Sequence, residues 1–295
     1  MGAKGFITIA LTVCVFAAFY FTRPAALTIS FASNYAPSTE AGALVFHAAG
    51  CATCHISPDA EFSEMPELAG GIAFPSQFGT FYAPNISPHP TQGIGAWDLD
   101  AFANAVMLGV SPDGQHYYPA FPYLAYQHMT ENDVADLFEY IQTLPASGTS
   151  SVSHDLIFPF NIRRGLGFWK LAFTDNKFVK KATKNPNIDR GTYLVEGLSH
   201  CAECHTPRNA AGALDKSQWM AGAPNLSGSG LVPNITPAVL DWSEADLIEY
   251  FTSGFTPEYD TAGGKMADVI NNLSKLPQED REAIAAYVLA IKPLP

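Results

Sequence analysis

The longest hydrophobic stretch of the chain lies at its N-terminus. Residues 5–22 (GFITIALTVCVFAAFYFT) carry no charge and stand between Lys4 and Arg23. A helix of this length, at about 1.5 Å per residue, reaches roughly 27 Å, close to the thickness of a bilayer core. We therefore expect residues 1–23 to form a transmembrane helix that stays attached as a signal anchor.

The alternative is a signal peptide that is removed after export. Signal peptides usually have a shorter apolar stretch that ends in a cleavage site of small residues. Here Arg23-Pro24 follows at once, and the first suitable site, Phe31-Ala32-Ser33, comes further along the chain. Under either interpretation the rest of the chain is exported.

Beyond this stretch, apolar residues recur with helical spacing in four segments. Two of them begin at a tryptophan and end at a glycine: 97–109 (WDLDAFANAVMLG) and 242–254 (WSEADLIEYFTSG). The other two are 130–145 (TENDVADLFEYIQTLP) and 277–293 (PQEDREAIAAYVLAIKP), and the first of these opens with a capping pattern from Thr130 to Asp133. The pattern predicts a helical protein in which each type of helix occurs twice.

The duplication extends beyond the helices. YAPNISP at 82–88 matches LVPNITP at 231–237. Each of these stretches follows, at nearly the same distance, one of two cysteine motifs: CATCH (Cys51, Cys54, His55) and CAECH (Cys201, Cys204, His205). A repeat of this size predicts two small helical domains in tandem.

The C-x-x-C-H spacing is the attachment pattern of c-type haem. Two thiols about one helical turn apart can form thioethers to both vinyl groups, and the adjacent histidine then binds the iron from the proximal side. A zinc site would need a second Cys/His pair nearby, and a C-x-x-C pair is seldom a structural disulfide. We predict two covalently bound haem c groups, with His55 and His205 as iron ligands.

A haem built for electron transfer normally has a methionine opposite its histidine. Met266 lies twelve residues after Gly254, in a glycine-rich loop, and we expect it to bind the second iron. The same offset from Gly109 leads to Phe121, whose ring cannot bind iron. The first haem therefore needs another ligand or has none from this chain.

Three solutions are open for the first haem. Met129 lies eight residues after Phe121, about two helical turns, and is the preferred sixth ligand. His128 or His116 could bind instead, and the last solution is an open or water-bound iron.

Charge is distributed unevenly over the chain, whose net charge is −12. Residues 24–162 contain no lysine or arginine, residues 163–190 form a basic segment, and the remainder is acidic again. An acidic body argues against nucleic acid as a partner, because phosphate contacts need a basic face. Hydrophobic residues make up 47% of the chain, enough to form cores in both domains.

Residues 41–295 resemble the diheme part of the membrane-bound cytochrome c subunits that accept electrons from bacterial alcohol, gluconate and sugar dehydrogenases. The matching stretches are VFHAAGCATCH, YAPNISP with GIGAW, YYPAFPY, FPFNIRR, RGTYLVEGLSHCAECHTPRN and GGKMADVI. This chain has YPAFPY where the family has YPAMPY, and fuller members of the family carry a third haem domain.

The resemblance implies an all-α fold with an N-terminal transmembrane helix and two tandem class I-like cytochrome c domains. The expected divisions are a signal anchor (1–23), a linker (24–40), cytochrome c domain 1 (41–147), a basic linker (148–186) and cytochrome c domain 2 (187–295).

The implied function is electron transfer from a periplasmic dehydrogenase, or another donor, to a cytochrome or oxidase of the respiratory chain. The protein would cross the bacterial inner membrane once and hold its haem domains in the periplasm. No nucleophile–base pair, phosphate loop or flavin fingerprint indicates an enzyme. The alternative is a diheme peroxidase-like enzyme with an open first haem.

Overall fold

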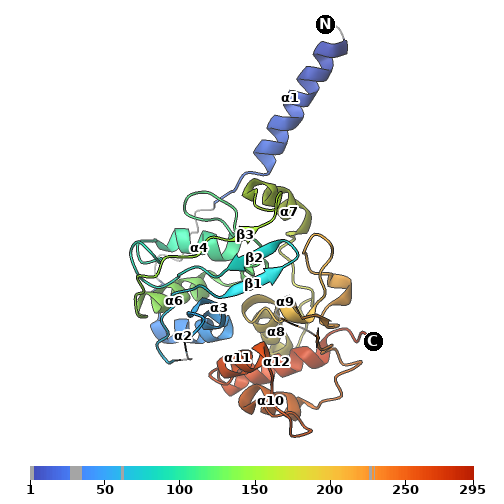
Figure 1. Cartoon of the computed structure of the whole chain (residues 1–295). Coiled ribbons are helices and arrows are strands. Elements are labelled where there is room, and N and C mark those ends of the chain that lie inside the picture. The colour runs from blue at the N-terminus through green and yellow to red at the C-terminus, as the bar shows by residue number, and fades with distance from the viewer. Residues whose placement is uncertain (1–2, 27–34, 61–62, 226–227, 229) are drawn as a thin grey trace.

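The computed structural model describes residues 3–26, 35–60, 63–225, 228 and 230–295. Helix α1 (Ala3–Phe21) projects away from a body built mostly of helices (Figure 1). Among the described residues, one helical stretch is long and apolar enough to cross a membrane, Lys4–Phe21, and none of it is buried. The alternative cleavage site at Phe31-Ala32-Ser33 and much of the expected 24–40 linker lie outside the described residues.

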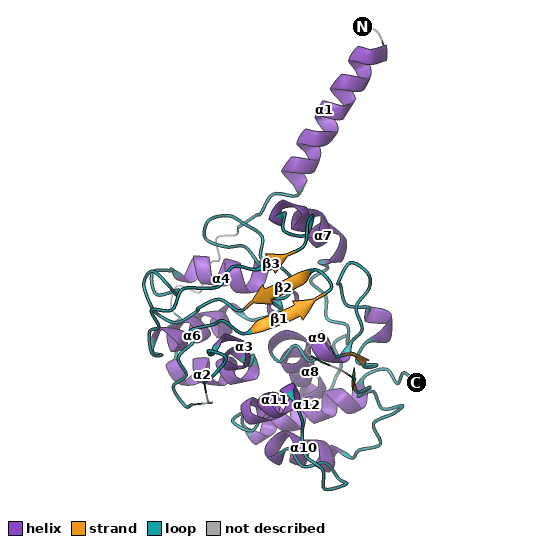
Figure 2. Cartoon of the chain, in the orientation of Figure 1, coloured by secondary structure: helices purple, strands orange, loops and turns teal. Residues whose placement is uncertain are grey.

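Two groups of helices make up the body (Figure 2). The first unit contains α2 (Thr39–Ala48), α3 (Cys51–His55), α4 (Leu99–Leu108), α5 (Tyr123–Tyr126) and α6 (Glu131–Gln142). The second contains α8 (Pro186–Thr192), the π-helix η2 (Tyr193–Leu198), α9 (Ala202–His205), the 3-10 helix η3 (Lys216–Gln218), α10 (Glu244–Ser253), α11 (Lys265–Leu273) and α12 (Gln278–Ala290). Between them lie the 3-10 helix η1 (Arg163–Gly165) and α7 (Leu166–Phe173).

The four helices expected from the periodic segments are confirmed. Helix α6 is capped by Thr130, whose side chain accepts a hydrogen bond from the Asp133 N–H. Helices α4 and α10 begin two residues after their tryptophans, because Asp98 and Ser243 accept hydrogen bonds as N-caps.

Short strands modify the expected all-α fold. Strands β1 (Ala73–Ser76), β2 (Gly79–Tyr82) and β3 (Asp155–Leu156) form an antiparallel sheet in the order β1-β2-β3. In the second unit, β4 (Ala223–Pro224) pairs with β5 (Leu231–Val232). The fold is therefore mostly helical with a small sheet on the first unit, and strands this short leave no alternating pattern in the sequence.

In each unit the first and last helices cross where a glycine allows close approach. A Cβ on Gly42 of α2 would lie 2.0 Å from the Asp136 carbonyl oxygen of α6. A Cβ on Gly191 of α8 would lie 2.0 Å from the Ala283 carbonyl oxygen of α12. The two crossings are the same arrangement, made once in each copy of the repeat.

We predict that Gly191→Ala destabilises the protein by about 3 kcal/mol, because the added methyl group has no room at the crossing of α8 and α12. Gly165→Ala is the matched control, since a Cβ there meets no atom within 4 Å and its φ of −60° suits alanine. Thermal unfolding of the two variants checks this. Equal melting temperatures would show that the crossing is not tightly packed.

The repeat is also present in the loop hydrogen bonds. The Asn85 side chain accepts from the Ser87 N–H and donates to the Ser147 carbonyl oxygen. The Asn234 side chain accepts from the Thr236 N–H and donates to the Leu294 carbonyl oxygen. The two repeated stretches, 82–88 and 231–237, thus bind the segment that follows the last helix of each unit through the same hydrogen bonds.

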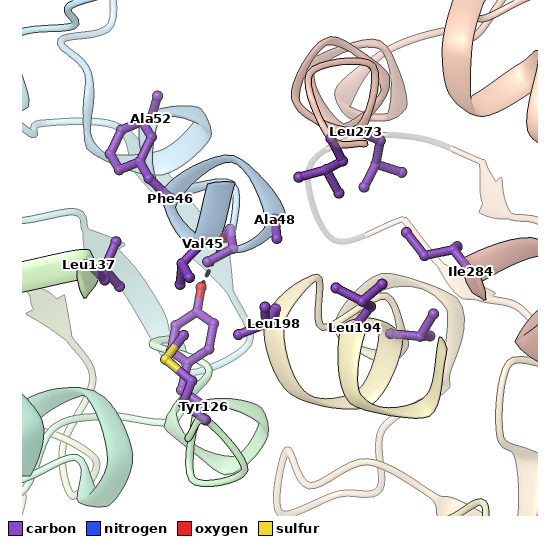
Figure 3. Packing of buried hydrophobic residues seen from close by; sticks show 14 of the residues in the cluster. Val45, Phe46, Ala48, Ala52, Tyr126, Leu137, Leu194, Leu198, Leu273 and Ile284 are labelled. Atoms are coloured by element: carbon purple, nitrogen blue, oxygen red, sulfur yellow. Dashed lines mark hydrogen bonds between the residues drawn. The ribbon is translucent and has the colours of Figure 1, made fainter. Parts of the chain in front are cut away.

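One continuous hydrophobic core joins the two units. Figure 3 shows Val45 and Ala48 of α2 opposite Leu194 and Leu198 of η2, with Leu273 of α11 on the same side of the interface. Each of these five side chains is at most 5% exposed. The units therefore pack as one body.

The segment expected as a basic linker, 148–186, belongs to that body. Its strand β3 pairs with β2, and the Trp169 Nε1–H of α7 donates to the Ala211 carbonyl oxygen of the second unit at 2.8 Å. Further on, Glu196 accepts hydrogen bonds from the Val179 and Lys180 N–H groups. The segment therefore runs across both units and contacts each of them.

Candidate haem sites

Both cysteine motifs lie on short helices, α3 and α9, that are entered in the same way. The residue before the first cysteine is left-handed in each unit: Gly50 has φ 61° and His200 has φ 40°. Glycine adopts this conformation readily, whereas a histidine requires surrounding contacts to hold it. His200 has such a contact, a 3.3 Å hydrogen bond between its Nε2 and the Ala49 carbonyl oxygen.

The two motif histidines are oriented identically. His55 Nδ1 lies 2.9 Å from the Pro84 carbonyl oxygen, and His205 Nδ1 lies 2.8 Å from the Pro233 carbonyl oxygen. A carbonyl accepts, so Nδ1 carries the proton and Nε2 is left to bind a metal. Desolvation lowers the pKa of both histidines, which keeps the imidazoles in the neutral form that a metal needs.

The rival interpretations of the cysteines find no support in the geometry. Cys51, Cys54, Cys201 and Cys204 are not paired with one another in disulfides. Within the described part of the chain, no three histidine, cysteine or acidic side chains converge in a way that could hold a metal ion by themselves. Each motif therefore offers two cysteine sulfurs and one imidazole nitrogen, the groups through which a covalently bound haem is held.

Two buried polar atoms close to the motifs also fit a haem. The Tyr123 hydroxyl, at the start of α5, and the Ser199 hydroxyl, two residues before Cys201, are buried without a hydrogen-bond partner among the described residues. Buried polar groups are usually paired. A haem held at the motifs would bring propionate oxygens that can accept from such hydroxyls.

The offset that relates Phe121 to Met266 is confirmed by the backbone. After α4, the Tyr117 N–H donates to the Gly109 carbonyl oxygen at 2.8 Å, and after α10 the Ala262 N–H donates to that of Gly254 at 2.8 Å. Four residues after Tyr117, the Phe121 N–H donates to the Tyr118 carbonyl oxygen at 3.0 Å and closes a turn.

In the second unit, four residues after Ala262, the Met266 N–H donates to the Gly263 carbonyl oxygen at 3.2 Å and closes the turn that corresponds to the one at Phe121. Phe121 and Met266 therefore occupy the same place in the two units.

Phe121 sits among aromatic rings. Its ring centre lies 5.7 Å from that of Tyr126, 6.1 Å from Tyr117 and 6.5 Å from Tyr123, in edge-to-face contacts. Such contacts fix the ring and keep the loop apolar. Met266, in the first turn of α11, is half-buried.

The structure gives Met129 a packing position. Met129 is 4% exposed and precedes the α6 cap Thr130, from where an apolar residue commonly packs on the fourth residue of the helix, here Val134. Its counterpart before α12 is Leu276, 3% exposed, which cannot bind iron. Ligation by Met129 stays a prediction, and this placement favours the solution without a ligand from the chain.

The two histidine candidates have other contacts. His116 Nε2 lies 2.9 Å from the Thr22 carbonyl oxygen at the foot of α1. The His128 ring stacks on Phe178 at 4.1 Å between ring centres. The His116 Nδ1 is buried without a hydrogen-bond partner among the described residues, so ligation by a histidine stays a prediction.

The two motifs lie beside the interface between the units. The Asn272 side-chain amide of α11 donates to the Thr53 hydroxyl, inside the first motif, at 3.0 Å. The Tyr126 hydroxyl, drawn in Figure 3, donates to the Ala49 carbonyl oxygen. His200 Nε2 lies 3.3 Å from the same oxygen. The two attachment sites are therefore neighbours.

Sequence patterns did not reveal several of these residues. Pro84 and Pro233 lie inside the repeated stretches 82–88 and 231–237. The repeat therefore pointed to these residues, but it did not show that their carbonyl oxygens contact the motif histidines. Asn272 and His200 act across the interface, and a single sequence contains no signal for such pairing.

Fold and site together define a c-type cytochrome, and comparison with known proteins agrees. Residues 39–145 match the family model of cytochrome c. The diheme cytochrome c-type protein of Cereibacter sphaeroides is 50% identical over 272 residues, which cover 92% of each chain. The chain belongs to the cytochrome c family and carries covalently bound haem c, the cofactor through which these proteins transfer electrons.

Other relatives are subunits of larger enzymes. The fructose dehydrogenase cytochrome subunit of Gluconobacter japonicus is 40% identical over 88% of this chain. The cytochrome c subunit of the quinone alcohol dehydrogenase of Gluconacetobacter polyoxogenes is 33% identical over 87% of this chain. The match covers 54% and 56% of these two relatives, so the chain spans little more than half their length.

Proposed function

We propose that the protein is a membrane-anchored carrier with two haem c groups, which takes electrons from a periplasmic dehydrogenase and passes them to a respiratory-chain acceptor. The observation that carries the proposal is the pair of equivalent C-x-x-C-H sites that lie beside one packed interface and contact the opposite unit through Asn272 and His200. The diheme name of the relative from Cereibacter sphaeroides supports the number of haems. The two tandem domains, 41–147 and 187–295, are part of the same proposal.

Each residue of the sites has a distinct role in this proposal. Cys51, Cys54, Cys201 and Cys204 would hold the two haems through thioethers, and Nε2 of His55 and of His205 would each bind one iron. Met266 would be a second ligand for the iron at His205. Phe121 stands at the equivalent place in the first unit, where Met129 is the candidate ligand. The bound haem supplies one-electron chemistry, and the chain sets its potential through these ligands.

The interface is the feature that makes two sites into one carrier. Asn272 joins α11 of the second unit to the first motif, and His200 joins the second motif to Ala49 of the first unit. These contacts hold the two attachment helices at a fixed separation. An electron that enters at one site would then pass to the other across this interface.

The names of the relatives support a dehydrogenase as donor. They include cytochrome subunits of fructose, alcohol and gluconate dehydrogenases. Helix α1 supports placement in the bacterial inner membrane, with the haem units in the periplasm. We further propose that the chain itself is not an enzyme.

The test uses native membranes from cells that express the chain and from cells that lack it. Primary alcohols, gluconate and fructose are added in turn, and the absorbance of the c-type haem is followed. We expect one substrate class to reduce the haem through a dehydrogenase that co-purifies with the chain. Reduction at the same rate without the chain would contradict a place in that electron path.

Phe121 supports one further candidate, a diheme peroxidase-like enzyme with an open first haem. Such an enzyme needs an acid–base group on the distal side. The rings that contact Phe121 are the tyrosines 117, 123 and 126, whose pKa values burial raises, so they are poor proton donors and acceptors. Electron transfer is therefore the better supported function.

A further inference from the structure

Helix α7 presents its faces in an unusual way. Lys170 points toward the body, where its Nζ donates to the Leu108 and Gly109 carbonyl oxygens at 2.6 and 2.8 Å. Phe168 and Leu171, one turn apart on another face, are 57% and 61% exposed. A helix on a water-exposed surface normally turns its charged residues outward. In α7 the large apolar side chains face outward instead.

The loop before α7 continues this apolar surface. Ile157, Phe158, Phe160 and Ile162 are 60%, 75%, 46% and 51% exposed. The backbone of the loop is held by the body, since the Ile157 N–H donates to the Phe78 carbonyl oxygen and the Tyr118 hydroxyl donates to that of Phe160. These side chains are therefore exposed on an ordered segment.

The composition of the segment differs from the rest of this acidic protein. Residues 156–174 contain no aspartate or glutamate and carry Arg163, Arg164 and Lys170. Aromatic and aliphatic residues combined with arginine and lysine are typical of surfaces that lie in the headgroup region of a membrane. We call the exposed residues 157, 158, 160, 162, 168 and 171 the apolar collar.

Several contacts join this segment to the foot of α1. The Arg164 guanidinium donates to the Phe19 carbonyl oxygen and stacks over the Phe19 ring at 4.2 Å. A Cβ on Gly167 would lie 2.1 Å from the Thr22 carbonyl oxygen, so α7 packs directly on the end of α1. In Figure 1, α7 lies beside that end of the body from which α1 projects. The collar is thus fixed next to the point where α1 leaves the body.

We propose that the apolar collar inserts into the surface of the same bilayer that α1 crosses, and so holds the haem units in one orientation on the membrane. Arg23 follows Thr22 at the end of α1, and Arg163 donates to the carbonyl oxygen of His116, whose ring contacts Thr22, so both arginines would lie near anionic headgroups. The proposal rests on the role of α1 as an anchor, which is part of the proposed function. The apolar surface is continuous with that anchor, and this continuity favours lipid over a protein partner.

The test places spin labels on the full-length holoprotein in nanodiscs of phosphatidylcholine and phosphatidylglycerol. In a Cys14→Ser background, a nitroxide is attached to Phe158→Cys, to Leu171→Cys or to the control Val239→Cys. Val239 is 55% exposed and precedes α10 (Glu244–Ser253), the helix that Figure 1 shows at the end of the body away from α1. Haem content and co-elution with the nanodiscs are measured for each variant.

We expect labels at 158 and 171 to collide more with oxygen, which concentrates in lipid, and less with a water-soluble nickel chelate. The label at 239 should show the reverse. Collar labels that behave like the control, or that meet neither quencher, overturn the proposal while leaving the anchor intact. A chain that does not enter nanodiscs overturns both the anchor and the collar, and leaves the haem assignment untouched.

Discussion

Replacing Cys201 and Cys204 together with alanine should halve the haem bound per chain. The first motif keeps its own thiols and its own histidine contact to Pro84, so its attachment does not depend on the second. The second unit should also lose stability, because a small domain relies on its cofactor to complete the core. The measurement is haem content per chain after denaturation and removal of unbound haem.

The matched control is Cys14→Ala, which removes the one cysteine outside the two C-x-x-C-H motifs. Cys14 is exposed on α1 and belongs to no C-x-x-C-H motif, so the haem content should not change. The reciprocal pair, Cys51→Ala with Cys54→Ala, should leave the other haem. If acid–acetone extraction removes haem from the unaltered protein, thioether attachment is the wrong account.

Replacing Met266 with alanine should convert the second haem to a high-spin form and lower its reduction potential. A thioether favours ferrous iron, and the choice of axial ligand moves haem potentials over a range of roughly 0.8 V. Phe121→Met should make the opposite change in the first haem, because position 121 occupies the place of Met266. Absorption spectra and potentiometric titration of the two variants check both expectations.

Met129→Ala distinguishes ligation of the first haem by Met129 from the other possibilities, a histidine ligand or an open iron. If Met129 binds iron, this variant shifts the first haem to high spin, and Met129→Leu does the same. If Met129 only packs before α6, as its counterpart Leu276 does, Met129→Leu leaves the spectrum unchanged and Met129→Ala costs stability alone. A first haem that binds carbon monoxide in the unaltered protein then identifies the open site.

Much of this organisation could be predicted from local signals. The C-x-x-C-H spacing by itself predicts haem attachment, and the capping pattern at Thr130 predicts the helix that begins at Glu131. The twelve-residue offset to Phe121 and Met266 could be read from the repeat because glycine ends α4 and α10 in both units. Each of these signals lies within a few residues of the feature it predicts.

The parts that were not predicted depend on contacts between distant segments. Residues 148–186 were expected to be a linker because lysines and arginines are concentrated there. In the structure, β3 joins the sheet, and Lys170 donates to the Leu108 carbonyl oxygen at the end of α4. Met129 has the residue type and spacing of a ligand, and the burial that gives it a packing position before α6 is seen only in the folded chain. Asn272 reaches the first motif from 219 residues away.

The most direct test of the central claim is a spectroelectrochemical titration of the purified full-length protein. The account predicts reversible reduction with one electron for each of the two C-x-x-C-H motifs, and two distinguishable potentials because Met266 has no equivalent at Phe121. Uptake of only half as many electrons per chain, or two haems with identical potentials and ligand spectra, would contradict it.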